Sequence, residues 1–284
     1  MSTVPGCGMT SPAGSAGVFD RVADTYDDVG VPWFQPIAQG LVDELSVRPG
    51  ERVLDVGCGR GAALVPLARA AGPSGTVLGI DLAPRMVERT AHDVRDLPQV
   101  EVRVADATAP GLPPASYDVV ASSLVLFFMP DPGGAVRTWA RLLVDGGRLG
   151  VTTFGPQDER WKRIDALFTP YLPPEMLDAR TSGQRGPFSS DEGVEQLLRD
   201  AGLTDVRTTH RRIEAVFRDA EHLLEFSWSH GQRAMWEAVP EHEHRRLREQ
   251  VRAAVEQLQS SSAPLVLTQQ VRITLGRRGD AMGA

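Results

Sequence analysis

Hydrophobic residues in this chain fall into short runs that alternate with amphipathic stretches. Five runs rich in Val and Leu are bounded by Gly, Pro or Asp, which is typical of strands buried on both faces of a parallel sheet. They cover residues 52–57, 76–81, 100–106, 117–124 and 147–154. Between them, the segments 62–72, 83–94 and 133–147 carry apolar residues at helical spacing. This alternation predicts an α/β fold with a doubly wound, mostly parallel sheet.

The pattern changes after Phe154, where we expect a helical cap to begin. Several prolines interrupt the helical periodicity of the next segment, which ends in a glycine-rich loop. Two further strand patterns and two long helical patterns follow. The predicted divisions are a disordered tail (1–17), a core with N-terminal helices (18–154), a cap insertion (155–187), a continuation of the core (188–217), a helical extension of the cap (218–263), and a last strand with a tail (264–284).

The composition limits the kind of partner. The chain has 30 basic and 37 acidic residues and a formal net charge of -7, so it lacks the basic surface that nucleic-acid binding needs. Its two cysteines, Cys7 and Cys58, stand far apart, which favours a reducing compartment over a disulfide. No secretory signal pattern or membrane-spanning apolar run is present. We therefore expect a soluble, cytoplasmic protein whose partner is a small molecule, with neither nucleic acid nor membrane as partner.

The stretch VLDVGCGRGAA at 53–63 indicates a ligand-binding loop at the end of the first strand. Glycines at alternate positions let a ligand approach the backbone closely, where a Cβ would collide. Gly57, Gly59 and Ala62 also match the fingerprint of dinucleotide-binding proteins. On this pattern alone, a nicotinamide-dependent dehydrogenase stays an alternative.

Three acidic residues lie at strand ends around this loop. Asp55 precedes the glycines, Asp81 ends the second strand and Asp106 ends the third. Because the carboxyl ends of parallel strands line one crevice, the three carboxylates should converge there. They suit an ammonium group, a pair of ribose hydroxyls and an adenine amine, in that order. A ligand with these three parts fits S-adenosylmethionine better than a dinucleotide.

Five motifs in order resemble those of class I S-adenosylmethionine-dependent methyltransferases, close to the ubiquinone and menaquinone biosynthesis branch and to small-molecule, natural-product methyltransferases. The motifs are VFDRVADTYD (18–27), VLDVGCGRG (53–61), GIDLAPRMVERT (79–90), VADATAPGLPPASYDVV (104–120) and LLVDGGRLGV (142–151). The resemblance implies a Rossmann-like, seven-stranded sheet with an antiparallel last strand. It also implies that 18–154 binds S-adenosylmethionine as cofactor and that methyl transfer is an in-line displacement.

The resemblance further implies which residues meet each part of the cofactor. From the methionine end to the adenine, they are Tyr26 at the carboxylate, Gly57 and Gly59 under the methionine, Ser122 or Ser123 at the sulfonium, Asp81 at the ribose hydroxyls, Leu82 and Met86 beside the adenine, and Asp106 with the Ala107 backbone at its edge. Three more residues of the glycine loop complete the predicted cofactor-binding set: Asp55, Cys58 and Gly61.

Methyl transfer to a hydroxyl or an amine removes a proton from the acceptor, so a general base is expected. Many relatives carry a histidine or asparagine just after the fourth strand, whereas this chain has Phe127 and Phe128 there. Of the six histidines, His230 lies among aromatic residues of the predicted cap and is the first candidate, with His222 next. No zinc-binding signature accompanies the histidines, so we predict no metal.

Aromatic residues outside the predicted sheet gather in the N-terminal region and the cap. If they face inward they line an acceptor cavity, and if they join the cap to the core they say nothing about substrate. The predicted substrate-binding residues are Trp33, Phe34, Phe127, Phe168, Tyr171 and Trp228. We predict methyl transfer to O, C or N of a small, largely apolar metabolite, such as a secondary metabolite or a quinone-like compound. A protein that binds S-adenosylmethionine without transferring methyl is the alternative.

Overall fold

The computed structural model describes residues 12–177, 185–259 and 263–279. Its centre is a seven-stranded sheet in the order β3-β2-β1-β4-β5-β7-β6. The strands are β1 (Arg52–Val56), β2 (Thr76–Asp81), β3 (Val100–Val104), β4 (Tyr117–Ser123), β5 (Leu143–Gln157), β6 (Leu203–Phe217) and β7 (Leu265–Arg278). β1 to β5 are parallel, and β7 is antiparallel to its neighbours β5 and β6. The predicted fold class, strand number and antiparallel last strand are confirmed.

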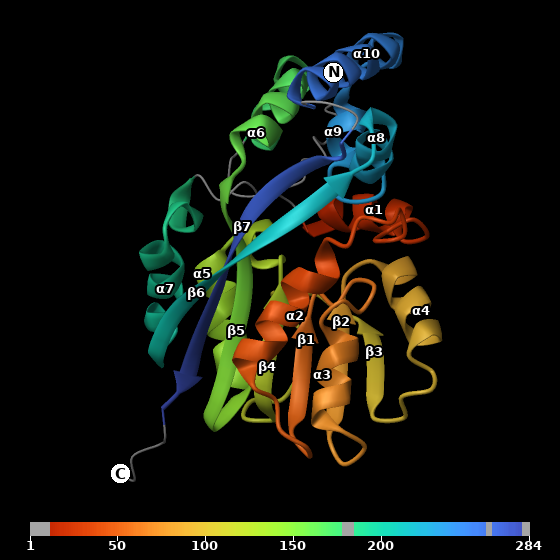
Figure 1. Cartoon of the computed structure of the whole chain (residues 1–284). Helices are drawn as coiled ribbons and strands as arrows, with labels where there is room; N and C mark the ends of the chain where they lie inside the picture. Colours follow the sequence, from red (N-terminus) through yellow and green to blue (C-terminus); the bar gives the residue numbers. More distant parts are fainter. Residues whose placement is uncertain (1–11, 178–184, 260–262, 280–284) are drawn as a thin grey trace, which may run out of the picture.

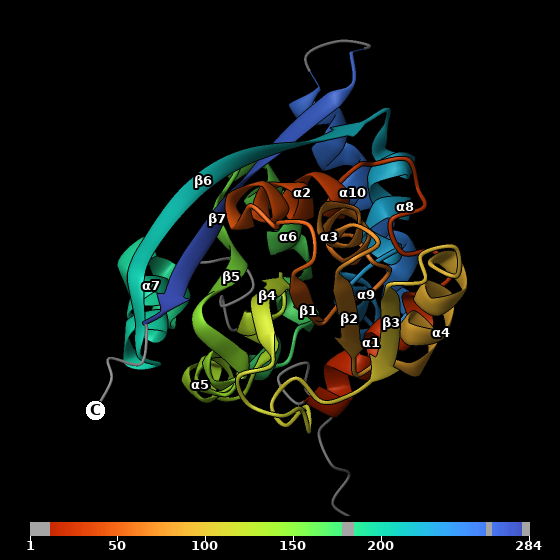
Figure 2. The same ribbon diagram turned by 90° about the horizontal axis from the view of Figure 1, so that it is seen from below.

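Helices cover both faces of this sheet (Figure 1, Figure 2). α2 (Phe34–Leu45) and α3 (Leu64–Ala71) pack on one face, and α5 (Pro132–Leu142) and α7 (Asp191–Asp200) pack on the other. α4 (Pro84–Asp93) lies against β2 and β3. Because both faces are shielded, four of the five residues of β1 are buried, which explains its nearly continuous apolar run. No helix in the described ranges combines the length and apolarity needed to cross a membrane.

Three long strands carry the cap. β5, β6 and β7 extend past the rest of the sheet (Figure 1), and β6 stays paired with β7 from Leu203↔Arg278 to Phe217↔Leu265. α6 (Glu159–Asp165) follows β5, whereas α8 (Ala220–Trp228), α9 (Arg233–Ala238) and α10 (His244–Leu258) connect β6 to β7. β5 itself continues to Gln157, past the cap boundary predicted after Phe154. The cap is therefore an outgrowth of the sheet.

α1 (Pro12–Val22) lies between the cap and the sheet (Figure 1). Its backbone is helical from residue 12, which corrects the tail predicted over 1–17; residues 1–11 lie outside the described residues, as do cap residues 178–184 and the end of the chain from 280. Asp20 Oδ1 accepts a hydrogen bond from the Arg85 backbone N–H at 2.7 Å, and Arg21 Nε donates to Glu237 Oε1 at 3.0 Å. α1 is thus tied both to α4 beside the sheet and to α9 in the cap.

Candidate active site

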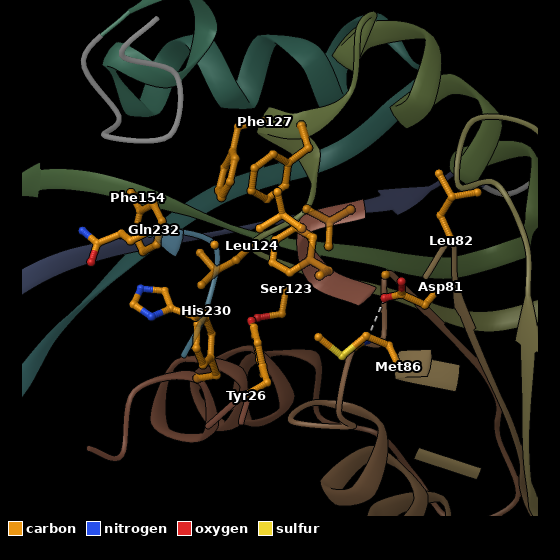
Figure 3. Close-up of a pocket in the computed structure, with 18 of the residues that line it drawn as sticks. Tyr26, Asp81, Leu82, Met86, Ser123, Leu124, Phe127, Phe154, His230 and Gln232 are labelled. Carbon is orange, nitrogen blue, oxygen red and sulfur yellow. Dashed lines mark hydrogen bonds between the residues drawn. The ribbon is translucent and has the colours of Figure 1, made fainter. Parts of the chain in front are cut away.

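A cavity opens at the carboxyl ends of β1, β2 and β4 and continues beneath the cap. Figure 3 shows its two ends: Asp81, Leu82 and Met86 lie together at one, which we call the cofactor end, and His230 and Gln232 lie at the other, the cap end. The glycine loop, the ends of β2 and β4, α1 and the cap supply its walls. The cavity therefore joins the predicted cofactor site to the predicted acceptor site.

The glycine loop leaves part of its backbone open to the cavity. Gly57 and Gly59 have φ angles of +72° and +48°, in the left-handed region that favours glycine. A Cβ on Gly57 would come within 2.4 Å of Val125, whereas a Cβ on Gly59 would meet nothing within 4 Å. Packing therefore requires glycine at Gly57, and the space beside Gly59 is free. That space is the cradle that the methionine moiety of S-adenosylmethionine would fill.

Asp81 ends β2 and fixes the glycine loop. Its Oδ2 accepts a hydrogen bond from the Gly59 backbone N–H at 2.8 Å, and its Oδ1 accepts one from the Ala83 backbone N–H at 2.9 Å. Burial raises the pKa of Asp81, and these backbone donors oppose the shift. Each carboxylate oxygen has a second lone-pair site. Asp81 can therefore accept two ribose hydroxyls while it keeps both backbone hydrogen bonds.

Asp55 lies behind the loop without a partner. It is 1% exposed, and neither carboxylate oxygen has a hydrogen-bond partner in the described part of the chain. Burial raises the pKa of Asp55 to about 7, and the negative charge on Asp81 adds to this shift. The nearby Leu64 backbone N–H opposes the shift, but its geometry is not that of a hydrogen bond. An unpaired buried carboxyl is costly, so a cation in the cavity would stabilise its charged form. The residue is not in the cavity lining, which corrects the predicted direct contact.

The residues predicted for the adenine lie together at the cofactor end. Leu82, Met86, Asp106 and Ala107 all line the cavity. Asp106 Oδ1 accepts hydrogen bonds from the backbone N–H and the hydroxyl of Thr108, at 2.8 and 2.7 Å. Its Oδ2 has no donor among the described residues, and the Ala107 backbone N–H has no acceptor there. An available acceptor beside an available backbone donor matches the amine edge of adenine.

The middle of the cavity is formed where β4 meets β5. Thr152 Oγ1 lies 3.0 Å from Ser123 Oγ and accepts a hydrogen bond from the Leu124 backbone N–H at 2.9 Å. Leu124 has a φ of +59°, a conformation that costs energy for a branched side chain and is found at functional sites. From the opposite wall Tyr26 points toward Ser123 (Figure 3), and burial raises its pKa, so the phenol stays protonated.

Three other predicted cofactor residues also lie outside the cavity lining: Cys58, Gly61 and Ser122. Ser122 is buried and its Oγ donates to the Val56 carbonyl at 3.0 Å, so Ser123 alone of the serine pair faces the cavity. Burial raises the pKa of the Cys58 thiol, with nearby carboxylate charges adding to the shift. Gly61 donates its N–H to the Cys58 carbonyl at 2.8 Å and closes the turn. These three residues therefore support the backbone of the glycine loop and the strand ends without lining the cavity.

An aromatic wall encloses the cap end. Trp33, Phe34 and Phe127, all predicted to bind substrate, line the cavity. Phe34 stacks on Tyr26 with ring centroids 4.4 Å apart, and Phe127 stacks on Phe154 at 5.5 Å. The lining also contains aromatic residues that the predicted set leaves out: Phe19, Phe128, Phe154 and Trp161. The wall therefore suits a flat, apolar acceptor.

Phe168, Tyr171 and Trp228 lie elsewhere in the cap and do not line this cavity. Phe168 and Trp228 both pack on Trp236, with ring centroids at 4.8 and 5.5 Å, and Phe168 lines a smaller cavity behind the first. The Tyr171 hydroxyl donates to Glu243 Oε2 at 3.1 Å. These contacts hold cap elements to one another. The prediction that these three bind substrate is corrected to a packing role.

The two candidate bases differ in position. His230 lines the cavity, and its Nδ1 lies 2.6 Å from the Phe226 carbonyl oxygen. Because a carbonyl only accepts, Nδ1 carries the proton and Nε2 keeps its lone pair. Burial lowers the pKa of His230 to about 4, with the Phe226 carbonyl opposing the shift, so the ring is neutral near pH 7. His222 is buried outside the cavity with Nε2 2.7 Å from the Val29 carbonyl, so it is not in reach of an acceptor.

A polar group at the cap end was missed by sequence reasoning. Gln157 Nε2 donates to Asp165 Oδ2 at 2.8 Å, and Gln232 Nε2 donates to Asp165 Oδ1 at 3.3 Å. Gln269 lies in the same lining. Burial raises the pKa of Asp165 to about 7, and the hydrogen bond from Gln157 opposes the shift. These residues come from β5, α6, the turn before α9, and β7, so no local motif could have indicated them.

Comparison with known proteins relates the chain to methyltransferases. Residues 54–151 match a family model described as a methyltransferase domain. Nocamycin O-methyltransferase of Saccharothrix syringae is 40% identical over 235 residues, which are 78% of this chain and 84% of that protein. Aklanonic acid methyltransferase DauC of Streptomyces sp. (strain C5) is 40% identical over 162 residues, which are 56% of this chain and 74% of that protein.

Solved structures share the fold at lower identity. The YcgJ protein of Bacillus subtilis has a TM-score of 0.58 at 16% identity, and the match covers 87% of this chain and 99% of that chain. Phosphoethanolamine N-methyltransferase 2 of Haemonchus contortus, solved with phosphomonomethylethanolamine and S-adenosylhomocysteine, has a TM-score of 0.55 at 16% identity. That match covers 92% of this chain and 58% of the other. These two likenesses concern the fold alone.

The sheet with an antiparallel β7, and the glycine loop beside Asp81, define a class of Rossmann-like enzymes that bind a nucleoside-bearing cofactor at one sheet edge. Together with the relatives, they identify the chain as a member of the class I S-adenosylmethionine-dependent methyltransferases, with S-adenosylmethionine as cofactor. The nicotinamide-dependent dehydrogenase that the glycine pattern left open is excluded.

Proposed function

We propose that this enzyme transfers the methyl group of S-adenosylmethionine to a hydroxyl oxygen of a small, largely apolar, aromatic or polyketide-like metabolite. The observation that carries the proposal is the continuous cavity, which runs from the glycine loop into an aromatic enclosure beneath the cap. Trp33, Phe34 and Phe127 form much of this enclosure. An enclosed aromatic site favours a compact acceptor over a nucleic acid or a protein chain.

The names of two relatives support this choice of acceptor. The nocamycin enzyme is an O-methyltransferase by name, and the aklanonic acid enzyme is named for a small-molecule acid. The first of them is matched over 84% of its length, and the matched stretch of 235 residues is longer than the cofactor domain, so the similarity extends beyond that domain. Together the names favour a natural-product acceptor and an oxygen nucleophile.

We assign the proton transfer to His230. S-adenosylmethionine supplies an activated methyl group on its sulfonium, and the electron pair of the broken C–S bond stays on sulfur. His230 Nε2 accepts the proton that the acceptor hydroxyl loses as its oxygen bonds to the methyl carbon. The Phe226 carbonyl holds the ring in the tautomer that this step needs, through its contact with Nδ1.

The aromatic wall contributes alignment and exclusion of water. The ring of Phe34 lies between Tyr26 and His230, with centroids at 4.4 and 5.7 Å. This column leads from the middle of the cavity, where Tyr26 faces Ser123, to the candidate base. A flat acceptor packed against it would have its nucleophile directed toward the methyl group in an in-line approach.

The test is a methyl-transfer assay with S-adenosylmethionine labelled in its methyl group. The enzyme is incubated with a panel of two- to four-ring aromatic compounds that carry hydroxyl, amino or acidic C–H groups. We expect label in the hydroxylated compounds, as methyl ethers, above the rate of acceptor-free cofactor breakdown. Labelling confined to amino or C–H compounds would overturn the assignment to oxygen, and labelling of none would overturn the aromatic acceptor.

A further inference from the structure

The cap end of the cavity contains a cluster of polar side chains beside its aromatic wall. Asp165 accepts hydrogen bonds from the Gln157 and Gln232 amides on its two oxygens, and all three side chains line the cavity. Gln269 joins them, but its Nε2 donates to the carbonyls of Gly155 and Gln270, at 2.9 and 2.8 Å. Gln157, Asp165 and Gln232 are half-buried and Gln269 is buried, so a ligand that displaces water from them has to replace the hydrogen bonds of that water.

The atoms that remain without partners here are mostly acceptors. The amide oxygens of Gln157, Gln232 and Gln269 receive no donor from the described residues, and none of them is among the buried polar atoms sealed away from the cavity. Asp165 keeps a second lone-pair site on each oxygen. This end of the cavity therefore favours a ligand that donates hydrogen bonds.

The cluster lies far from the position of the transferred methyl group. Thr152 contacts Ser123 in the middle of the cavity, and Gln157 follows five residues later on β5, roughly 16 Å along the strand at about 3.3 Å per residue. Figure 3 shows Gln232 beyond His230, at the opposite end from Leu82 and Met86. The group that the cluster binds is therefore at the far end of the acceptor, away from its reacting oxygen.

We propose that Gln157, Asp165 and Gln232 form a specificity site that recognises a hydroxyl or N–H donor at the end of the acceptor remote from the methylated oxygen. The inference rests on the proposed aromatic acceptor. An acceptor with one donor at each end spans the cavity, with its reacting hydroxyl near His230 and the second donor on Asp165. Molecules that lack the second donor displace water from the half-buried Asp165 carboxylate and the glutamine amide oxygens without replacing its hydrogen bonds, and so bind weakly.

The test compares two rigid probes that differ by one donor. The probes are 2,6-dihydroxyanthraquinone and 2-hydroxyanthraquinone, titrated calorimetrically into the full chain saturated with S-adenosylhomocysteine. The wild type is compared with Asp165→Asn, which replaces one carboxylate oxygen with an N–H donor. Asp200→Asn is the matched control, because Asp200 is an exposed carboxylate that also accepts a bond from a glutamine amide, that of Gln196 at 2.6 Å.

We expect the wild type and Asp200→Asn to bind the dihydroxy probe at least tenfold more tightly than the monohydroxy probe. In Asp165→Asn the preference should fall to twofold or less, with S-adenosylhomocysteine affinity unchanged. If Asp165→Asn does not fold, Gln232→Met carries the same test and should also reduce the preference.

Two results would overturn the inference while leaving the proposed function intact: equal affinity of the wild type for both probes, or an undiminished preference in Asp165→Asn. If neither probe binds although S-adenosylhomocysteine does, the aromatic acceptor is wrong, and the specificity site is wrong with it.

Discussion

The cofactor end and the cap end of the cavity are built in opposite ways. The cofactor end consists of short, contiguous pieces at strand ends: the loop around Gly59, then Asp81 and Asp106. The cap end brings together side chains from β5, α6 and the turn before α9. In the first case a strand and its turn fix the geometry locally. In the second, geometry depends on how far β5, β6 and β7 carry the cap beyond the sheet.

This difference separates two kinds of recognition. The methyl donor is the same in every member of the family, so a fixed local motif can hold it. The acceptor differs between enzymes, and here it faces a set of side chains on separate elements, each of which can change without disturbing the glycine loop. Substitutions at the two ends should therefore affect different kinetic quantities.

The largest effect should come from His230→Ala. Loss of the Nε2 lone pair should lower kcat by about 100-fold, the low end for loss of a general base, while the affinity for S-adenosylmethionine stays unchanged. His222→Ala is the matched control, because it is a second buried cap histidine held by a backbone carbonyl but outside the cavity. Turnover measured below the melting temperature of both variants distinguishes them. An equal loss in the two would show that cap packing matters and a base at His230 does not.

Asp81→Ala should affect only the cofactor end of the cavity. It removes the acceptor for both ribose hydroxyls and should weaken S-adenosylmethionine binding by about 2 kcal/mol, roughly 30-fold. Calorimetric titration with S-adenosylhomocysteine measures the loss. Asp96→Ala, at an exposed acid in the turn after α4, controls for the change in net charge. A folded Asp81→Ala protein with wild-type affinity would contradict the assignment of Asp81 to the ribose.

A smaller effect is expected at Gly59. A Cβ there would project into open space, so Gly59→Ala should fold but fill the cradle and weaken cofactor binding by about tenfold, or 1.4 kcal/mol. Gly72→Ala is a close control, since Gly72 also has a positive φ, +65°, with nothing within 4 Å of the added Cβ. Both variants place a Cβ on a residue with a positive φ, and Gly72 also has a ψ of -177°, which is unfavourable for any residue but glycine. Weakened binding in both would mean that strain, and not contact with the cofactor, is responsible.

Much of the cofactor end could be predicted from sequence, because its signals are local. The run at 76–81 is bounded by Gly75 and ends at Asp81, and β2 has those same limits. At the cap end, the aromatic residues of the sequence predicted burial, but not which side chains face the cavity and which pack within the cap. Phe34 faces the cavity, whereas Phe168 packs on Trp236. Asp165 carried no signal at all, because its role depends on two glutamines brought from other elements.

The smallest effect concerns stability. An acid whose pKa is raised in the folded state binds more protons folded than unfolded, so its contribution to stability falls as pH rises. For Asp55 the window runs from its ordinary pKa of 3.8 to about 7. Asp55→Asn removes this burden and should stabilise the apo protein at pH 8 by on the order of 1 kcal/mol, with little change at pH 4.

Urea unfolding of the variant and the wild type at both pH values measures the difference, so pH effects shared by the two chains cancel. The same variant should bind S-adenosylmethionine more weakly, because the ammonium group loses the nearby negative charge. Higher stability of Asp55→Asn together with lower affinity for S-adenosylmethionine would show that the Asp55 carboxylate serves cofactor binding at a cost in stability. Lower stability at pH 8 would mean instead that Asp55 holds the glycine loop, through contacts that its neutral amide cannot make.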